Sequence, residues 1–313
     1  MLAIEINKSL CTKCGACRDI CCNSRVITMD SDGYPVYKYI HKCISCGHCI
    51  AICAKNAITA KNTAAGNSNN FITDVKPLGK HTFKPDQIHD LLAGIRSDRS
   101  FTPKPVEKEK LEQILEVMIQ SASAGNEQNR NYYIFTNPRD IQSIEEDIQK
   151  LNQKQASLLK NPLVRKTMTK SLEKNCSAVY KENGITLSKE DTADCISQIF
   201  TSITDKDADF FLKKAPVLII VTYDAAKKGM HENFYKTDIG IALTNGIILA
   251  HVMGLSNCRF GLAEIFLNKS KETKAKYGIP GNEKIGGVLG LGYSETDWKR
   301  IPPRGPAKVM WKR

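Results

Sequence analysis

Several features that would place this chain in a common protein class are absent from its 313 residues. It has no uninterrupted run of eighteen apolar residues, which argues against a membrane-spanning helix. Its first residues lack the basic, apolar and small-residue order of a secretory signal, so we expect a cytoplasmic protein. P-loop, HExxH and GxGxxG motifs are missing too, which argues against a self-contained NAD-binding domain.

Acidic residues are too few to balance the basic ones. The chain has 45 Lys and Arg against 33 Asp and Glu, which gives a formal net charge of +12. Such an excess is common in nucleic-acid binders. Here the basic residues are scattered among acidic ones, with no block of five or more. We therefore expect no nucleic-acid partner, and a basic surface that would receive an acidic redox protein.

Cysteine, in contrast, is abundant and clustered, since nine of the twelve cysteines lie in the first 53 residues. The spacing C-x2-C-x2-C-x3-C occurs twice, at Cys11, Cys14, Cys17 and Cys21 and again at Cys43, Cys46, Cys49 and Cys53. A disulfide framework is not expected in a reducing cytosol. Zinc is the alternative metal, but zinc sites pair one C-x2-C with a distant second pair. The doubled run instead has the spacing of bacterial ferredoxins, in which the fourth cysteine binds the other cluster.

Residues 1–62 therefore resemble a two-cluster bacterial-type ferredoxin domain. The resemblance implies two 4Fe-4S clusters and transfer of single electrons. One cluster is assigned to Cys11, Cys14, Cys17 and Cys53, and the other to Cys43, Cys46, Cys49 and Cys21. Cys22, Cys176 and Cys195 receive no role.

The rest of the chain has the composition of a linker and a larger unit. Residues 63–85 are rich in Asn, Gly, Ser and Lys, which is typical of a linker. Residues 86–313 alternate helical and strand patterns, so the chain is expected to be α+β. Helical spacing marks residues 111–118 and 238–255, while 131–136, 215–224 and 284–293 are predicted strands. Residues 139–214 are polar and predict a helical insertion that forms a lid.

Three segments in this larger unit carry a second resemblance: "GIRSDRSFTPKPV", "SASAGNEQNRNYYIFT" and "GGVLGLGYSETDWKRIPPRGPAKVMW". In this order and at these separations they are similar to the motifs of the nitroreductase family of FMN enzymes. The resemblance implies an α/β sandwich, with a central, mostly antiparallel sheet flanked by helices. It also implies an intertwined homodimer with FMN in clefts at the subunit interface, which the apolar helix at 238–255 would suit.

The same resemblance proposes the residues that bind FMN. A phosphate favours the paired donors of arginine. The proposed phosphate ligands are Arg96, Ser97, Arg99, Arg300 and Arg304. Side-chain hydroxyls and amides can hydrogen-bond the flavin ring without adding charge. The proposed ring ligands are Ser123, Asn126 and Gln128. Gly261 is expected where backbone approaches the flavin, with an ordinary turn as the alternative. Arg130 is expected to face solvent, with contact to flavin or substrate as the alternative.

Together the two resemblances predict an FMN- and iron–sulfur-dependent oxidoreductase. Electrons from a soluble ferredoxin would pass through the clusters to FMN and on to a nitroaromatic, a quinone or an activated alkene. No side chain is predicted as catalytic, because the flavin N5 carries the chemistry. Two alternatives remain open: NAD(P)H could reduce FMN and the clusters carry electrons outward, or the protein could be a non-catalytic redox carrier or sensor. An anaerobic host is expected.

Overall fold

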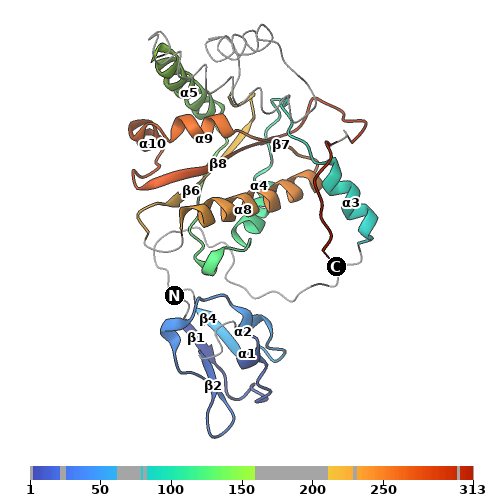
Figure 1. Ribbon diagram of the computed structural model, residues 1–313, viewed down its shortest axis with the longest axis vertical. Coiled ribbons are helices and arrows are strands. Elements are labelled where there is room, and N and C mark those ends of the chain that lie inside the picture. Colours follow the sequence, from blue (N-terminus) through green and yellow to red (C-terminus); the bar gives the residue numbers. More distant parts are fainter. Residues whose placement is uncertain are drawn as a thin grey trace.

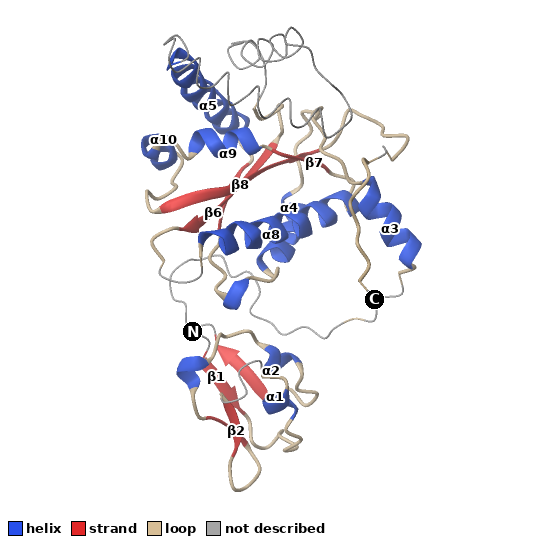
Figure 2. Ribbon diagram, viewed as in Figure 1, coloured by secondary structure: helices blue, strands red, loops and turns tan. Residues whose placement is uncertain are grey.

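The computed structural model describes residues 3–21, 26–61, 79, 83–158, 211–227, 231–301 and 304–312. The first two of these ranges form a small unit, and residues from 83 onward form a larger one built on a four-stranded sheet (Figure 1; Figure 2). Most of the predicted linker and of the predicted lid, together with Cys22, Cys176 and Cys195, lies outside the described residues.

The small unit consists of two antiparallel strand pairs with short helices between them. Strand β1 (Ala3–Ile6) pairs with β4 (Ile58–Lys61), and β2 (Ile27–Met29) pairs with β3 (Pro35–Tyr37). The helical segments are α1 (Ala16–Asp19), η1 (Ile40–Lys42) and α2 (His48–Ala51). Because β1 and β4 lie at the two ends of the cysteine-rich sequence, their pairing closes the unit on itself.

The larger unit has one sheet with the strand order β5-β6-β8-β7, in which every neighbouring pair is antiparallel. The strands are β5 (Asn131–Phe135), β6 (Val217–Asp224), β7 (Ser256–Arg259) and β8 (Glu283–Gly292). The helices are α3 (Pro85–Gly94), α4 (Lys108–Ile119), η2 (Ala124–Asn126), α5 (Pro138–Leu158), α8 (Glu232–Val252), α9 (Gly261–Leu267) and α10 (Lys271–Lys276).

Helices cover both faces of this sheet. Alternate side chains of β6 enter two separate cores because successive residues of a strand point to opposite faces. Leu218 and Ile220 pack with α5 and α9, whereas Ile219 and Val221 pack with α4 and α8. A strand buried on both sides must be apolar throughout, which explains the continuous run of residues 217–221. The predicted α+β class and flanked antiparallel sheet are confirmed.

Helix α8 lies unusually close to the sheet. A Cβ atom added to Gly287 would be 2.5 Å from Cδ1 of Leu243, and one added to Gly286 would be 2.5 Å from Cδ1 of Ile239. Both distances are shorter than any ordinary contact, so the two glycines permit this approach. The glycines of β8 therefore set how deeply α8 packs, and α8 in turn positions the site described below.

The described part of the predicted lid packs into the core. Phe211 is buried and makes an edge-to-face contact with Phe266, with 5.5 Å between the ring centroids. Tyr180, Phe200 and Phe210, the other aromatic residues within 139–214, lie outside the described residues. Among the described segments, no helix combines the length and apolar composition needed to cross a bilayer.

Candidate functional site

The loop after α3 carries the predicted phosphate ligands, and Asp98 anchors it. The Asp98 N–H donates to Asn257 O at 2.7 Å, which places the loop beside β7. Its carboxylate accepts hydrogen bonds from the Ser100 N–H, from the Ser294 hydroxyl and from Trp298 Nε1 at 3.4 Å. Burial raises the pKa of Asp98, but these donors outweigh it and hold the pKa below its ordinary value. The two predicted phosphate-binding segments are thus joined through one carboxylate.

Beside this loop lies a hollow of about 510 Å³. Three of the predicted phosphate ligands line it, namely Arg96, Ser97 and Arg304, together with apolar residues of α3 and α8. Arg96 Nη1 donates to Ile95 O at 2.6 Å, but its Nε is buried and has no hydrogen-bond partner. A buried donor without a partner is costly. The arrangement therefore suits an anionic ligand that would accept this bond.

The other two predicted phosphate ligands do not line the hollow. Arg99 and Arg300 are both exposed, and Arg99 Nη1 lies 3.4 Å from Ser97 O. Three polar residues that the sequence analysis missed do line it, namely Thr244, Asn257 and Arg259. Thr244 belongs to α8, and the other two belong to β7. The basic residue inside "CRFGLAE" was the signal that could have identified Arg259, because this segment was already linked to the flavin.

The guanidinium of Arg259 has only some of its donors paired within the chain. Its Nη2 lies 3.6 Å from Glu264 Oε2 and 3.4 Å from Gly286 O. These contacts use only part of a guanidinium that has five N–H donors. Arg259 can therefore bind a further acceptor while it keeps its contact with Glu264. Nearby Gly261 is exposed, and a Cβ added there would meet nothing within 4 Å, so no part of the chain approaches it closely.

The segment with the predicted ring ligands lies at the other end of α8. Both carboxylate oxygens of Asp238 accept the Ala124 N–H at 3.1 Å, and Tyr235 donates to Glu127 at 2.8 Å. The Ser123 hydroxyl accepts the Gln128 N–H at 3.1 Å. The loop of residues 121–130 is therefore fixed to the first turns of α8 by its own polar groups.

Arg130 does not face solvent as the sequence analysis expected. It is 9% exposed, and its guanidinium donates to oxygens at the end of α4 and on α8. The acceptors are Ser121 Oγ at 2.7 Å, Ser121 O at 2.8 Å, Ala122 O at 3.2 Å, Ile119 O at 3.4 Å and Asp238 O at 3.4 Å. The last carbonyls of a helix have no partner within it, so a nearby arginine is drawn inward to satisfy them.

Within one chain, the predicted phosphate ligands of FMN and its predicted ring ligands do not lie together. Thr244, Ile247 and Ile248 line the arginine hollow, whereas Asp238 holds the other loop. Ten residues of helix separate Asp238 from Ile248, which is about 15 Å along the axis. Arg96 and Ser123 therefore lie toward opposite ends of α8.

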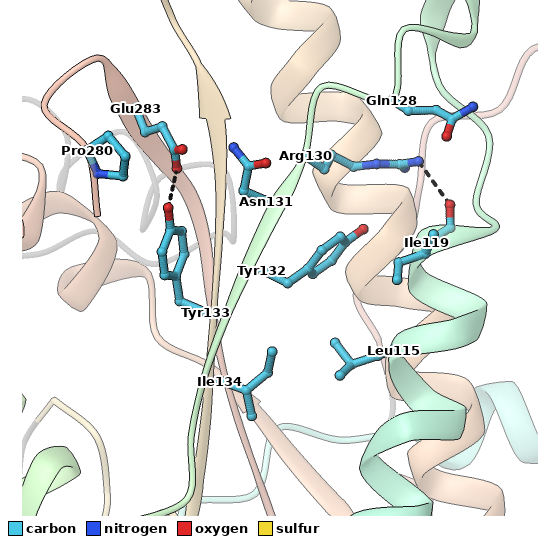
Figure 3. A pocket seen from close by; sticks show the side chains of 10 residues that line it. All are labelled: Leu115, Ile119, Gln128, Arg130, Asn131, Tyr132, Tyr133, Ile134, Pro280 and Glu283. Carbon is cyan, nitrogen blue, oxygen red and sulfur yellow. Dashed lines mark hydrogen bonds between the residues drawn. The ribbon is translucent and has the colours of Figure 1, made fainter. Parts of the chain in front are cut away.

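A second hollow of about 570 Å³ lies between β5 and α4, and Figure 3 shows its lining. Several of its polar groups already have partners. Tyr133 donates to Glu283 Oε2 at 3.0 Å, Thr222 donates to the same carboxylate, and Arg130 donates to Ile119 O. This hollow lacks the unpaired buried donor of the arginine hollow, so it makes the weaker candidate site.

The two cysteine runs of the small unit have matching backbone geometry. Lys13 and Ser45 both have positive φ, of 59° and 56°, and the glycines two residues later both have a φ of 75°. In each run the positive-φ residue donates its N–H to the sulfur of the first cysteine at 3.4 Å. A loop that curls its N–H groups toward sulfur would stabilise a thiolate.

The cysteines of the two runs are the predicted metal ligands of the small unit. Among the residues that the structure describes, no group of three or more His, Cys, Asp or Glu converges closely enough to hold one metal ion. A cubane differs from a single ion because each cysteine binds a separate iron at its own corner. Cys17 and Cys49 are buried, and the partly buried Cys21, Cys43 and Cys53 pack around them. The assignment of iron–sulfur clusters to these cysteines stays a prediction.

Comparisons with known proteins agree with the fold of the larger unit. A nitroreductase from Bacteroides fragilis, with FMN bound, is similar with a TM-score of 0.52 at 15% identity, covering 72% of this chain and 99% of that chain. A nitroreductase with bound FMN from Desulfitobacterium hafniense has a TM-score of 0.48 at 17% identity, covering 72% of this chain and 98% of that chain. A BluB-like flavoprotein from Clostridium difficile has a TM-score of 0.49 at 18% identity, covering 70% of this chain and 94% of that chain.

A search of curated proteins found no match. The model of the nitroreductase family matches residues 92–293, which is 202 of the 313 residues of the chain. This span includes the Arg96 loop, the loop of residues 121–130, all of α8 and the whole four-stranded sheet. The chain therefore belongs to the nitroreductase family.

Proposed function

We propose that this protein is an FMN-dependent oxidoreductase supplied with single electrons by two 4Fe-4S clusters. The observation that carries the flavin part is the buried, unpartnered Nε of Arg96 in a hollow that also contains Arg259 and Arg304. Three guanidinium groups and few acidic side chains around one hollow favour a dianionic phosphate. Family membership supports FMN as the molecule that carries this phosphate.

In this proposal Arg96, Arg259 and Arg304 hold the phosphate, and Ser97 adds a hydroxyl donor. Asp98 acts on the phosphate site only indirectly, by fixing the backbone of the loop between β7 and Ser294. The apolar residues of α3 and α8 exclude water from one side of the hollow, which strengthens the charged hydrogen bonds. When bound, FMN supplies the hydride or single-electron chemistry at its N5.

A homodimer would complete the flavin site. Ser123 and Gln128 are predicted to contact the flavin ring, yet they lie about 15 Å along α8 from the hollow. The face of α8 turned away from the sheet leaves Phe234, Ile241 and Val252 39% to 60% exposed. We propose that this face pairs with a second copy of the chain. The loop of residues 121–130 from one copy would then approach the arginine hollow of the other.

The small unit is proposed to hold the clusters with the ligand sets given above. Its sulfurs receive backbone N–H bonds, and Tyr37 adds a hydroxyl bond to Cys49 Sγ at 3.4 Å. Such bonds stabilise the thiolate and raise the reduction potential of a cluster. A one-electron carrier suits a flavin, which can collect two electrons one at a time. The acceptor would be a planar nitroaromatic, a quinone or an activated alkene.

Composition of the purified protein gives the direct test. Anaerobically purified protein should contain about eight iron, about eight acid-labile sulfide and about one FMN per chain if both assignments are right. Protein that contains FMN but no iron would overturn the cluster assignment alone. Stopped-flow mixing with reduced ferredoxin, in parallel with NADPH, identifies the donor. Rapid loss of flavin absorbance with NADPH alone would favour outward electron flow.

A further inference from the structure

The two cysteine runs have matching backbones but different surroundings. Cys14 is exposed, whereas its counterpart Cys46 is half-buried. Lys13 is likewise exposed, and its counterpart Ser45 is half-buried. Since the two loops curl in the same way, the local backbone does not explain this difference. Within the described part of the chain, a residue of the larger unit contacts the second loop but not the first.

Asn126 of the larger unit makes that contact. Its side-chain amide donates to Ile44 O at 3.1 Å and to Ser45 O at 2.8 Å. Both acceptors lie between Cys43 and Cys46, within the second cysteine loop. Figure 1 shows the green segment with η2 on the side of the larger unit that faces the blue unit. Sequence resemblance made Asn126 a flavin ligand, but its amide nitrogen is already committed to the cysteine loop.

The backbone of η2 is shaped for this contact. Asn126 has a φ of 53°, a conformation that asparagine tolerates better than most residues. Gln128 Nε2 donates to Asn126 Oδ1 at 3.2 Å, which orients the amide. The Ala124 N–H is held by Asp238. A chain of hydrogen bonds therefore runs from the second cysteine loop through Asn126 and η2 to α8.

We infer that the two cluster sites have different roles. Asn126 is the positioning residue that holds the second cysteine loop, and not the first, against the flavin unit. The site containing Cys43, Cys46 and Cys49 passes electrons into the flavin unit across the Asn126 contact. The site containing Cys11, Cys14 and Cys17 faces solvent and receives electrons from an external low-potential one-electron donor protein. This inference rests on the proposed function. Electron tunnelling weakens steeply with distance, so the loop held against η2 has the shorter path.

The surroundings of the first loop suit an acidic donor. Lys13 Nζ lies 4.3 Å from the centroid of the Tyr34 ring, and Lys8 Nζ lies 4.8 Å from it. The ring holds the charge of Lys13, the residue before Cys14 in the chain. Lys8 Nζ also lies 3.8 Å from Asp30 Oδ2, which offsets part of its charge. Opposite charge on a donor would accelerate its association with this surface. The donor supplies two electrons in two steps and solvent supplies the protons, so no bond of the chain forms or breaks.

Two substitutions separate the two roles. Asn126→Asp keeps the size and the tolerance of positive φ, but turns a donor into a carboxylate facing two carbonyls. Transfer from reduced clusters to flavin should slow about tenfold, equivalent to about 1.4 kcal/mol. Lys13→Asp should slow cluster reduction by an acidic bacterial-type ferredoxin, to a degree that falls with added salt. Transfer to flavin should be unchanged in this second variant.

The readouts are freeze-quench electron paramagnetic resonance for clusters, stopped-flow absorbance for flavin, and hydrogen–deuterium exchange for residues 44–48 and 123–128. Exchange should rise in both segments of Asn126→Asp without any change in iron or FMN content. Asn56→Asp is the matched control, because Asn56 is an exposed asparagine of the small unit with a φ of 52°. If Asn126→Asp misfolds, Asn126→Gly removes the amide while keeping the backbone conformation accessible.

The outcomes distinguish the inference from the function on which it rests. Wild-type protein that lacks iron or FMN overturns the proposed function. Wild-type protein in which reduced clusters do reduce FMN, but in which Asn126→Asp and Asn126→Gly change neither exchange nor transfer rate, overturns the inference alone. Slower transfer from already reduced clusters to flavin in Lys13→Asp would also overturn it, because it would show that the first loop, rather than the second, delivers electrons to the flavin unit.

Discussion

The polar side chains at the two ends of α8 differ in whether their hydrogen bonds are satisfied. At one end, Arg96 has a buried Nε without a hydrogen-bond partner, in a hollow with two further arginines. At the other end, the side chains of Asp238 and Arg130 are fully engaged with the chain itself. Sequence motifs assigned both ends to the same cofactor. We take the unpaired buried donor of Arg96 as a stronger indication of a ligand site than the motif residues.

The largest effect on stability is expected at the end of α8 near Arg130, where the polar side chains are hydrogen-bonded within the chain. Replacing Arg130 with Met would leave five oxygens at the end of α4 and on α8 without their donor. Because unsatisfied buried acceptors are costly, the free energy of unfolding should fall by about 3 kcal/mol. Urea unfolding followed by circular dichroism measures this. FMN affinity per folded molecule should change much less. A large loss of FMN binding without loss of stability would contradict the structural role given to Arg130.

At the open end, Arg96→Ala should weaken FMN binding roughly 100-fold, since charge-assisted hydrogen bonds to a phosphate are among the strong ones. Arg96→Lys should recover only part of the affinity because lysine lacks the planar fork. Fluorescence titration of flavin-free protein with FMN gives the dissociation constants. Arg139→Ala, an exposed arginine at the start of α5, is the control. Equal losses in Arg96→Ala and Arg139→Ala would mean that overall charge, rather than this hollow, binds the phosphate.

The hydrogen bonds of the Asp98 carboxylate should make the stability of the larger unit depend on pH. Its folded-state pKa lies below its ordinary value of 3.8, so its stabilising effect is complete above that pH and is lost as the pH falls through the lower folded value. Asp98→Asn should therefore cost about 2 kcal/mol at pH 7, and this difference should shrink toward pH 3. Both tryptophans of the chain lie in the larger unit, so tryptophan fluorescence during urea unfolding reports on it selectively. A difference that persists at pH 3 would contradict the role of the carboxylate.

The smallest effect is expected for Arg259, whose guanidinium Glu264 already engages in part. Arg259→Ala should weaken FMN binding about threefold to tenfold, less than Arg96→Ala, because fewer of its donors are available to a ligand. The same flavin titration applies. Glu264→Gln is informative in the opposite direction, since freeing the guanidinium should leave affinity equal or tighter. Weaker binding in Glu264→Gln would show that Glu264 acts by orienting Arg259.

Sequence patterns predicted much of this fold because they record local requirements. Helical spacing at residues 111–118 corresponds to α4, and the continuous apolar run at 215–224 corresponds to β6, since a strand buried on both faces has no polar side. Motif order also identified the family that the family model confirms for residues 92–293. The ferredoxin-like assignment of residues 1–62 and the individual cofactor ligands stay predictions.

Other features could not be predicted because they depend on residues far apart in the sequence. Arg130 was expected at the surface, yet Asp238 and the end of α4 create a buried set of acceptors for it. Arg259 has no motif of its own and becomes part of the hollow only because β7 lies beside the Arg96 loop. No local pattern indicates the buried setting of Arg130, and Arg259 is indicated only by its place two residues before Gly261.

The sequence by itself determined the chemistry that this protein has available: paired cysteine runs, arginines in two distant segments and an apolar strand that must be covered on both faces. These follow from residue type and spacing. Only the tertiary structure decided which arginines share a hollow, that Arg130 is used internally, and that Asn126 contacts the second cysteine loop rather than the first. The physical reason is that hydrogen-bond satisfaction depends on all the groups that folding brings within reach, which spacing along the chain does not specify.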